Sequence, residues 1–141
     1  MQENEWRFRE ELRKTGLRLT RNRQRIFEVL KHANRPLAIK QITEILNGEV
    51  HFTSIYRSIE TLTRARILRE VPHGFKNHYE LGEMFQPHHH HITCEYCGKS
   101  TSINDTRIEQ LMSELTIKAG LMPTRHNFEM FGICQRCRRN R

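Results

Sequence analysis

Apolar residues in the first half of the chain recur every third or fourth position in three consecutive segments. This spacing is typical of helices that bury one face. The segments begin near Thr20, Ala38 and Thr53, and both threonines are suited to cap a helix. The apolar positions are Ile26, Phe27, Val29 and Leu30, then Ile39, Ile42, Ile45 and Leu46, and finally Ile55, Ile59 and Leu62. With a short helix predicted over residues 3–14, the pattern favours a helix-turn-helix domain.

Two short apolar runs, residues 67–71 and 78–81, follow these helices and are separated by a segment that contains Pro72 and Gly74. Short runs bounded by such turn residues predict a β-hairpin. A hairpin directly after a recognition helix is the wing of a winged-helix domain. This domain, the head of the protein, is assigned to residues 1–82. Residues 83–87 show no periodicity and are predicted to form a linker.

The second half of the chain, residues 88–141, combines short apolar runs with one amphipathic segment. Strands are predicted at about residues 88–94, 99–104 and 124–131. A helix capped near Asp105 and ended by Gly120 is predicted between the last two strands. Its apolar stripe consists of Ile108, Leu111, Met112, Leu115 and Ala119. The chain is therefore expected to be an α+β protein in which a winged helix-turn-helix precedes a small α/β domain.

Charge is unevenly distributed along the 141 residues. The chain carries 24 Lys and Arg against 16 Asp and Glu, and residues 1–76 hold 16 of the basic and 9 of the acidic side chains. The head therefore carries most of the positive charge. This asymmetry favours a polyanionic partner, because basic side chains that neutralise phosphates release counterions. A solvated basic surface without a partner is the alternative.

The first fifteen residues are charged and lack the apolar core of a signal peptide, and no apolar run is long enough to span a membrane. A cytoplasmic protein is therefore expected. In the reducing cytosol, cysteines in paired CxxC motifs are metal ligands more often than disulfide partners.

Two such motifs are present, Cys94-Glu-Tyr-Cys97 and Cys134-Gln-Arg-Cys137. Two residues between thiolates let one turn present both sulfurs to a tetrahedral ion. The four cysteines thus predict a structural zinc site that ties the first strand of the second domain to its C-terminal end. Free thiols or a redox pair are the alternatives, but no thioredoxin-like βαβ pattern surrounds either motif.

Four consecutive histidines precede the first CxxC motif. Alternate side chains of a strand face opposite sides, so His89 and His91 share one face and His88 and His90 the other. This arrangement predicts two half-sites for a divalent metal ion, and imidazole suits Zn, Fe, Ni and Cu.

Further ligands for these half-sites are available from Glu80, Glu109 and His126. Each has a structural role as its alternative. Glu80 can be an ordinary exposed strand residue, Glu109 can complete a capping box with Thr106, and His126 can be a core or surface histidine.

Candidate DNA contacts lie in the head. Tyr56 and Arg57 face outward near the start of the predicted recognition helix, where Arg can contact guanine and Tyr a thymine methyl group or a phosphate. Four arginines cluster around the start of the first amphipathic helix, the one that begins near Thr20: Arg18, Arg21, Arg23 and Arg25. Phosphate or minor-groove contacts are natural there. A single Tyr or Arg is weak support, and only the whole set favours DNA binding.

Taken together, these motifs resemble the ferric uptake regulator family, which includes iron, zinc, manganese, nickel and peroxide sensors. The similarity extends over nearly the whole chain and is carried by residues 16–20, 53–57, 88–99 and 132–137. It implies a homodimer that binds a double-stranded, pseudo-palindromic DNA operator when loaded with metal. Such a repressor would control metal uptake or homeostasis genes and would not be an enzyme.

The resemblance also implies which residues bind metal and DNA. Structural zinc falls on Cys94, Cys97, Cys134 and Cys137. A regulatory metal site falls on Glu80, His89 and His91. A second site falls on His88, His90, Glu109 and His126. DNA contacts fall on Arg18, Tyr56 and Arg57, with Arg21 added from the same basic cluster. Besides the structural Zn²⁺, one or two further divalent ions are implied, iron or zinc ahead of manganese or nickel.

The sequence departs from the family pattern at two positions of the regulatory site, where Pro36 and Ser102 replace a histidine and an acid. A peroxide-responsive regulator is the alternative within the family, and it is disfavoured because no aspartate stands beside the histidines. A metal-storage protein or a metal-dependent hydrolase would also use the histidines. Neither explains the basic head, and the HExxH and zinc-deaminase patterns are absent from the sequence.

Overall fold

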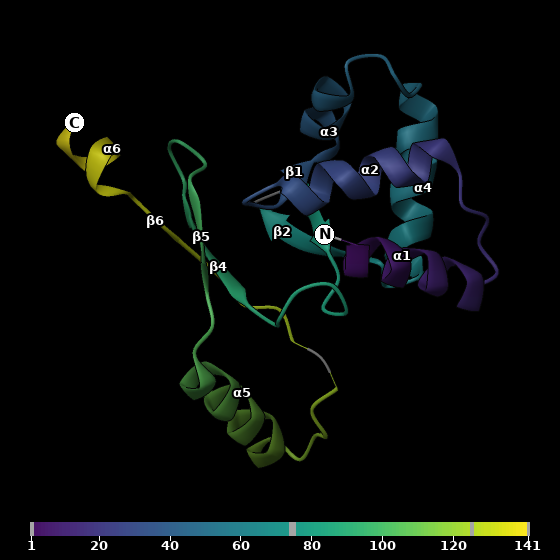
Figure 1. Cartoon of the computed structure of the whole chain (residues 1–141). Coiled ribbons are helices and arrows are strands. Elements are labelled where there is room, and N and C mark those ends of the chain that lie inside the picture. Colours follow the sequence, from purple (N-terminus) through teal and green to yellow (C-terminus); the bar gives the residue numbers. More distant parts are fainter. Residues whose placement is uncertain (1, 74–75, 125, 141) are drawn as a thin grey trace. The chain divides into compact units, whose positions relative to one another are not determined.

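The computed structural model describes residues 2–73, 76–124 and 126–140, and the chain forms two compact units, Met1–Pro87 and His88–Arg141 (Figure 1). Both units combine helices with a small sheet, which confirms the α+β class expected from the sequence. Within the described ranges, no helix has the length and apolar character needed to cross a membrane.

The first unit contains the helices expected from the hydrophobic pattern and a three-stranded sheet. Its elements are α1 (Gln2–Lys14), α2 (Arg21–His32), β1 (Leu37–Ala38), α3 (Ile39–Leu46), α4 (Phe52–Arg64), β2 (Leu68–His73) and β3 (Lys76–Leu81). The strands are antiparallel in the order β1-β3-β2, and Glu70 pairs with Tyr79 in the hairpin. The two-residue strand β1 adds an edge that the sequence pattern did not predict.

The core of the first unit lies where α1, α2, α3 and α4 meet the hairpin. Ile26, Ile42 and Ile55 are fully buried in it. The rings of Phe8 and Phe27 stack with centroids 4.2 Å apart, which attaches α1 to α2. Burial of these apolar stripes supplies the main driving force for folding, at about 25 cal/mol per Å² of apolar surface removed from water.

Residues 83–87, for which the sequence predicts a linker, pack on the first unit. The ring of Phe85 contacts Phe27 edge-on at 5.0 Å, and the guanidinium of Arg7 donates a hydrogen bond of 2.6 Å to the carbonyl oxygen of Met84. Gly82, which precedes this segment, must be a glycine because a Cβ there would lie 2.3 Å from the carbonyl oxygen of Arg66. Only glycine permits such a close backbone approach.

The helix caps agree with the sequence at one position and differ at another. The hydroxyl of Thr20 accepts a hydrogen bond of 3.3 Å from the backbone N–H of Arg23, as predicted for the start of α2. The predicted cap at Thr53 is wrong, because α4 begins at Phe52 and its N-cap residue is His51, which makes no side-chain capping bond.

The second unit contains a sheet, one long helix and one short helix. Its elements are β4 (His90–Cys94), β5 (Ser100–Ile103), α5 (Thr106–Lys118), β6 (Glu129–Gly132) and α6 (Gln135–Arg139). In the order β5-β4-β6, β4 pairs antiparallel with β5 and parallel with β6. β4 and β6 are shorter than predicted, and the short helix α6 was not predicted.

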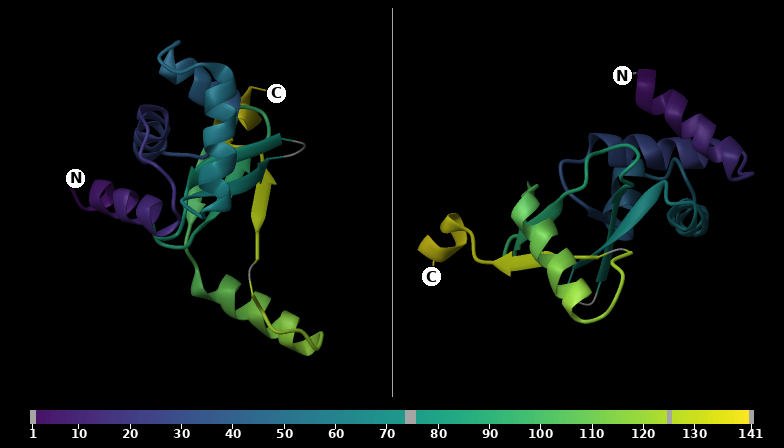
Figure 2. Two further views of the ribbon diagram at one scale, coloured as in Figure 1. Left: turned by 90° about the vertical axis from the view of Figure 1, so that its right-hand side faces the viewer. Right: turned by 90° about the horizontal axis from the view of Figure 1, so that it is seen from below.

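Helix α5 projects beyond the end of the sheet of its own unit (Figures 1 and 2). None of its residues is buried, although its sequence carries the amphipathic stripe noted above. The backbone is well capped: the carboxylate of Asp105 accepts a hydrogen bond of 2.9 Å from the N–H of Arg107. The helix therefore begins as predicted, but its apolar face is exposed within this chain.

Candidate metal centres and nucleic-acid interface

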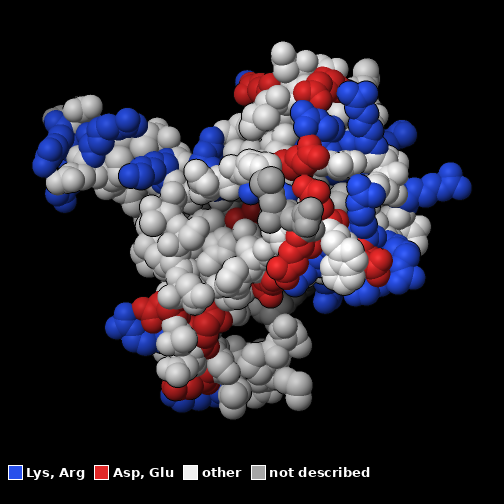
Figure 3. All heavy atoms as spheres, in the orientation of Figure 1, with Lys and Arg blue, Asp and Glu red and all other residues white. Residues whose placement is uncertain are grey.

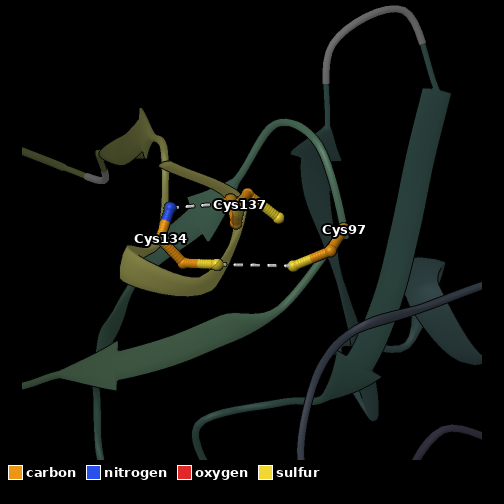
Figure 4. A group of neighbouring side chains, drawn as sticks. Cys97, Cys134 and Cys137 are labelled. Carbon is orange, nitrogen blue, oxygen red and sulfur yellow. Dashed lines mark hydrogen bonds between the residues drawn. The ribbon is translucent and has the colours of Figure 1, made fainter. Parts of the chain in front are cut away.

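The four cysteines come together at one end of the second unit. Figure 4 shows three of them, Cys97, Cys134 and Cys137, whose side chains point toward one another. Cys94 ends β4, Cys97 lies in the turn that follows, and Cys134 and Cys137 lie at the start of α6 and within it. Their sulfur atoms all lie within 4.8 Å of one another, and the sulfurs of Cys97 and Cys134 are 3.7 Å apart. Zn–S bonds of about 2.3 Å in a tetrahedron place sulfurs about 3.8 Å apart, so the donor set fits zinc.

The backbone explains why these four side chains converge. In the first CxxC turn, the N–H of Gly98, at a φ of +67°, donates to the carbonyl of Cys94. The parallel pairing of Cys94 with Gly132 then brings the second motif alongside, and the N–H of Cys134 donates to the sulfur of Cys94 at 3.3 Å.

Hydrogen bonds within the cluster shift the pKa values of two cysteines in opposite directions. Hydrogen bonds from the backbone N–H groups of Cys134 and Cys97 lower the pKa of Cys94 to about 6. The neighbouring sulfur of Cys134, through a hydrogen bond, raises the pKa of Cys137 to about 12. Four thiolates so close together repel one another, and a divalent cation between them removes that repulsion.

A second cluster joins three imidazoles and one carboxylate: His88, His90, Glu109 and His126, whose ligand atoms lie within 4.8 Å of one another. Glu109 is its centre. Its carboxylate oxygens lie 2.6 Å from Nε2 of His90, 3.1 Å from Nε2 of His126 and 3.4 Å from Nε2 of His88. The hydrogen bond with His90 is the main cause of the lowered pKa of Glu109.

This cluster also fits a metal ion. The Nε2 atoms of His88 and His126 are 3.2 Å apart, and those of His126 and His90 are 3.4 Å apart. All three imidazoles thus present the same nitrogen to one point beside a carboxylate, which is the arrangement of a tetrahedral zinc or iron site. The ring of Phe128 packs edge-on against His90 at 5.4 Å and restricts its rotation.

Two structural alternatives from the sequence are therefore wrong. Asp105, and not Thr106, caps α5, so Glu109 does not serve a capping box and instead faces the histidines. Glu80 is not an exposed strand residue, because it is 7% exposed on β3 and forms an ion pair with Arg69.

The third predicted set, Glu80 with His89 and His91, is divided between the two units. Glu80 belongs to the first unit and both histidines belong to the second, so this set stays a prediction. Within the second unit, the rings of His89 and His91 are in contact, 4.7 Å apart, and His91 is 2% exposed. Ser102 is the cross-strand partner of His91 in β5, and its side chain is exposed.

The candidate DNA contacts occupy the outer face of the helix-turn-helix. On α4, Tyr56 is 54% exposed and Arg57 is exposed, whereas Ile55 and Ile59 point into the core. Arg18 and Arg21 are exposed around the start of α2. Lys and Arg side chains gather on the visible face of the head and also on α6 (Figure 3).

The arginine cluster at α2 is not uniform. The guanidinium of Arg25 forms hydrogen bonds of 2.8 and 2.9 Å with both carboxylate oxygens of Glu49, and one of 2.7 Å with Glu28. Arg25 therefore joins α2 to the turn before α4 and is not free for a phosphate. The guanidinium of Arg23 donates to the carbonyl oxygen of Arg18 at 2.5 Å. No pattern in the sequence distinguishes Arg23 and Arg25 from Arg18 and Arg21.

A model of the Ferric uptake regulator family matches residues 14–131. The chain belongs to the ferric uptake regulator family. The resemblance inferred from the sequence is thus confirmed, and so is the expectation of a transcription regulator instead of an enzyme.

Relatives and solved structures agree with this assignment. The ferric uptake regulation protein of Shigella flexneri is 31% identical over 129 residues, covering 87% of this chain and 85% of the relative. That of Campylobacter jejuni is 29% identical over 139 residues, covering 93% and 86%. The Helicobacter pylori ferric uptake regulator structure is 26% identical with a TM-score of 0.79, over 97% of this chain and 93% of that one. A zinc uptake regulator complexed with zinc and DNA shares the fold, with 19% identity, a TM-score of 0.72 and 99% and 95% coverage.

Proposed function

We propose that this regulator is a homodimeric, metal-dependent repressor that binds an operator upstream of metal uptake or homeostasis genes, with iron or zinc as its effector. One observation carries the proposal. The second unit gathers a four-cysteine set and a separate His/Glu set, while the first unit exposes Tyr56 and Arg57 on a helix whose opposite face is buried. A chain of this kind links metal occupancy to a DNA-reading surface.

The two clusters of the second unit are suited to different tasks. The four cysteines leave no open position on a tetrahedral zinc ion, so this site is structural. His88, His90, Glu109 and His126 are also enough for four-coordinate binding. The H. pylori relative is described as having three functional metal-binding sites, and we assign the third here to Glu80, His89 and His91.

This third site is suited to regulation because its ligands come from both units. A metal ion there would favour the arrangement of head and second unit that binds DNA, by an amount equal to its differential affinity for that arrangement. The missing family ligands at Pro36 and Ser102 leave three protein ligands. Fewer ligands mean weaker binding, which suits a site that reports on metal availability.

The homodimer is supported by apolar side chains that α5 exposes. Leu111, Leu115 and Ile117 are 55%, 53% and 62% exposed. Met130 and Phe131, which lie in β6, are 44% and 40% exposed. An apolar surface of this kind is typical of an interface. A two-fold dimer would place two recognition helices about 10 base pairs apart, or a multiple of that, on a palindromic site.

The function is tested by metal analysis of untagged protein together with DNA binding in the presence of Fe(II), Zn(II), Mn(II) or Ni(II). We expect one tightly held zinc per chain and salt-sensitive operator binding that only the effector metal activates. DNA binding whose affinity does not depend on any of these metals, or that responds to peroxide alone, would contradict the proposal.

A pair of variants separates the two histidine faces. His89→Ala should weaken metal-activated DNA binding while the dimer persists. His126→Ala should lower bound metal and thermal stability more than it changes the response to metal. The reverse pattern would exchange the roles of the two sites.

A further inference from the structure

Two hydroxyl groups and one imidazole form a short hydrogen-bonded chain on one face of the sheet in the second unit. Nδ1 of His91 lies 3.3 Å from the hydroxyl of Ser100. The hydroxyl of Thr93 donates a hydrogen bond of 3.1 Å to the same Ser100 oxygen. His91 and Thr93 are 2% and 4% exposed. No expectation drawn from the sequence involved Ser100 or Thr93.

The strand register creates this chain. Thr93 pairs with Ser100 across β4 and β5, and His91 pairs with Ser102. Because side chains alternate along strands, all four of these residues project on the same face. Ser100 is thus the diagonal neighbour of His91, at a distance that a short hydroxyl side chain can bridge.

We propose that Ser100 is a positioning residue, which holds His91 as the Nδ1–H tautomer and so directs the Nε2 lone pair toward the regulatory metal ion. This inference rests on the proposed function only in taking His91 as a ligand. A neutral imidazole carries its proton on one nitrogen and accepts or binds metal with the other. When Nε2 binds metal, Nδ1 must carry the proton, and a buried N–H requires an acceptor.

The hydroxyl of Ser100 meets that requirement. A serine oxygen has two lone pairs, and the Thr93 hydrogen bond occupies one of them. The second lone pair is then directed to the Nδ1–H of His91, and Thr93 restrains the rotation of the Ser100 hydroxyl. Partners of this kind orient metal-binding histidines, and their loss typically lowers metal affinity about 10- to 100-fold. His91 in turn packs against the ring of His89, so its orientation also constrains the second histidine ligand.

The test compares Ser100→Ala with Ser102→Ala in the full-length, zinc-loaded protein. Ser102 lies on the same strand and face but is exposed, so it is a matched control. Imidazole ¹⁵N NMR reports the tautomer of His91. Titration with Co(II) reports the metal affinity, and the part of the Co(II) signal that His89→Ala removes belongs to this site. We expect Ser100→Ala to shift His91 toward the Nε2–H tautomer and to lower Co(II) affinity about 10-fold. Ser102→Ala should change neither, and Ser100→Thr should restore both.

The outcomes separate this inference from the proposed function. An Nε2–H tautomer in the unmodified protein, or an unchanged tautomer in Ser100→Ala, overturns the role of Ser100. Unchanged Co(II) affinity in Ser100→Ala also overturns it. If tautomer and Co(II) affinity both change while operator binding still responds to metal as before, Ser100 keeps its role and the regulatory assignment of the site fails.

Discussion

Helices α4 and α5 are equally long and both carry an apolar stripe, yet the stripe of α4 is buried and that of α5 is exposed. In α4, Ile55, Ile59 and Leu62 are at most 1% exposed. In α5, no residue is buried, and Leu111 and Leu115 are more than half exposed. The periodicity of apolar residues therefore predicts a helix with one apolar face, but it does not say whether the same chain buries that face.

The difference follows from what surrounds each helix. Helix α4 packs against α2, α3 and the hairpin of its own unit, so its stripe enters a core during folding. Helix α5 projects beyond its sheet. An isolated helix of this length is marginally stable in water, and a second copy of the chain would supply the missing cover.

The largest effect is expected from Cys94→Ser, which should affect the unit of α5 and spare that of α4. Zinc bound to such sites contributes about 10–16 kcal/mol of binding free energy that is coupled to folding. We expect loss of zinc and of the dimer, with the head still folded. Zinc content, light scattering and thermal unfolding measure this, and a stable, dimeric, zinc-free variant would contradict a structural role for the ion.

Ile59→Ala should show that α4 is stabilised from within its own chain. Removing a buried Ile side chain leaves a cavity and lowers the free energy of unfolding by about 2–5 kcal/mol. Ile45→Ala is the control, because Ile45 is 55% exposed on α3 and should cost less than about 0.5 kcal/mol. Urea unfolding followed by circular dichroism gives both values, and similar losses would show that burial does not distinguish the two positions.

Leu115→Glu should show that α5 is covered by a second chain. A carboxylate in an apolar interface must be desolvated, so we expect the dimer dissociation constant to rise at least about 100-fold, or about 2.7 kcal/mol. Analytical ultracentrifugation measures the constant. The conservative variant Leu115→Met should remain dimeric. If Leu115→Glu is as dimeric as the parent protein, the interface lies elsewhere.

Arg57→Ala tests whether the outer face of α4 binds DNA, since its inner face packs in the core. Loss of one base-contacting arginine should weaken operator binding by about 1–3 kcal/mol and relax preference at one base position. Binding to a series of operator variants measures both quantities. Unchanged affinity and preference would mean that α4 is not the recognition helix.

The smallest effect is expected at α2, where Arg21→Ala should reduce the slope of log affinity against log salt by about 1. Arg25→Ala should leave that slope nearly unchanged, because its guanidinium is already paired with Glu49 and Glu28. Fluorescence anisotropy at several salt concentrations distinguishes the two. Equal changes would show that the Arg25 ion pairs open to contact phosphates.

Much of the candidate chemistry could be predicted from the sequence because it depends on local geometry. The spacing of each CxxC motif fits a single turn, and the alternation of a strand separates His88 and His90 from His89 and His91. The stripes of α2, α3 and α4 likewise follow from the period of the helix. These features depend on the backbone within a few residues, so a sequence pattern is enough to identify them.

Tertiary structure alone decided which of several local roles each side chain takes. By its sequence position Glu109 suited a capping box as well as a metal site, and only the structure shows that it faces three histidines. Arg25 was indistinguishable from Arg21 in the sequence, but in the structure it forms an ion pair with Glu49, which is 24 residues away in the chain. Ser100 acquires a partner only through the pairing of β4 with β5. Contacts between distant segments depend on strand register and helix packing, and no short-range pattern encodes these. The same reason explains why the apolar stripe of α4 is buried and that of α5 is exposed.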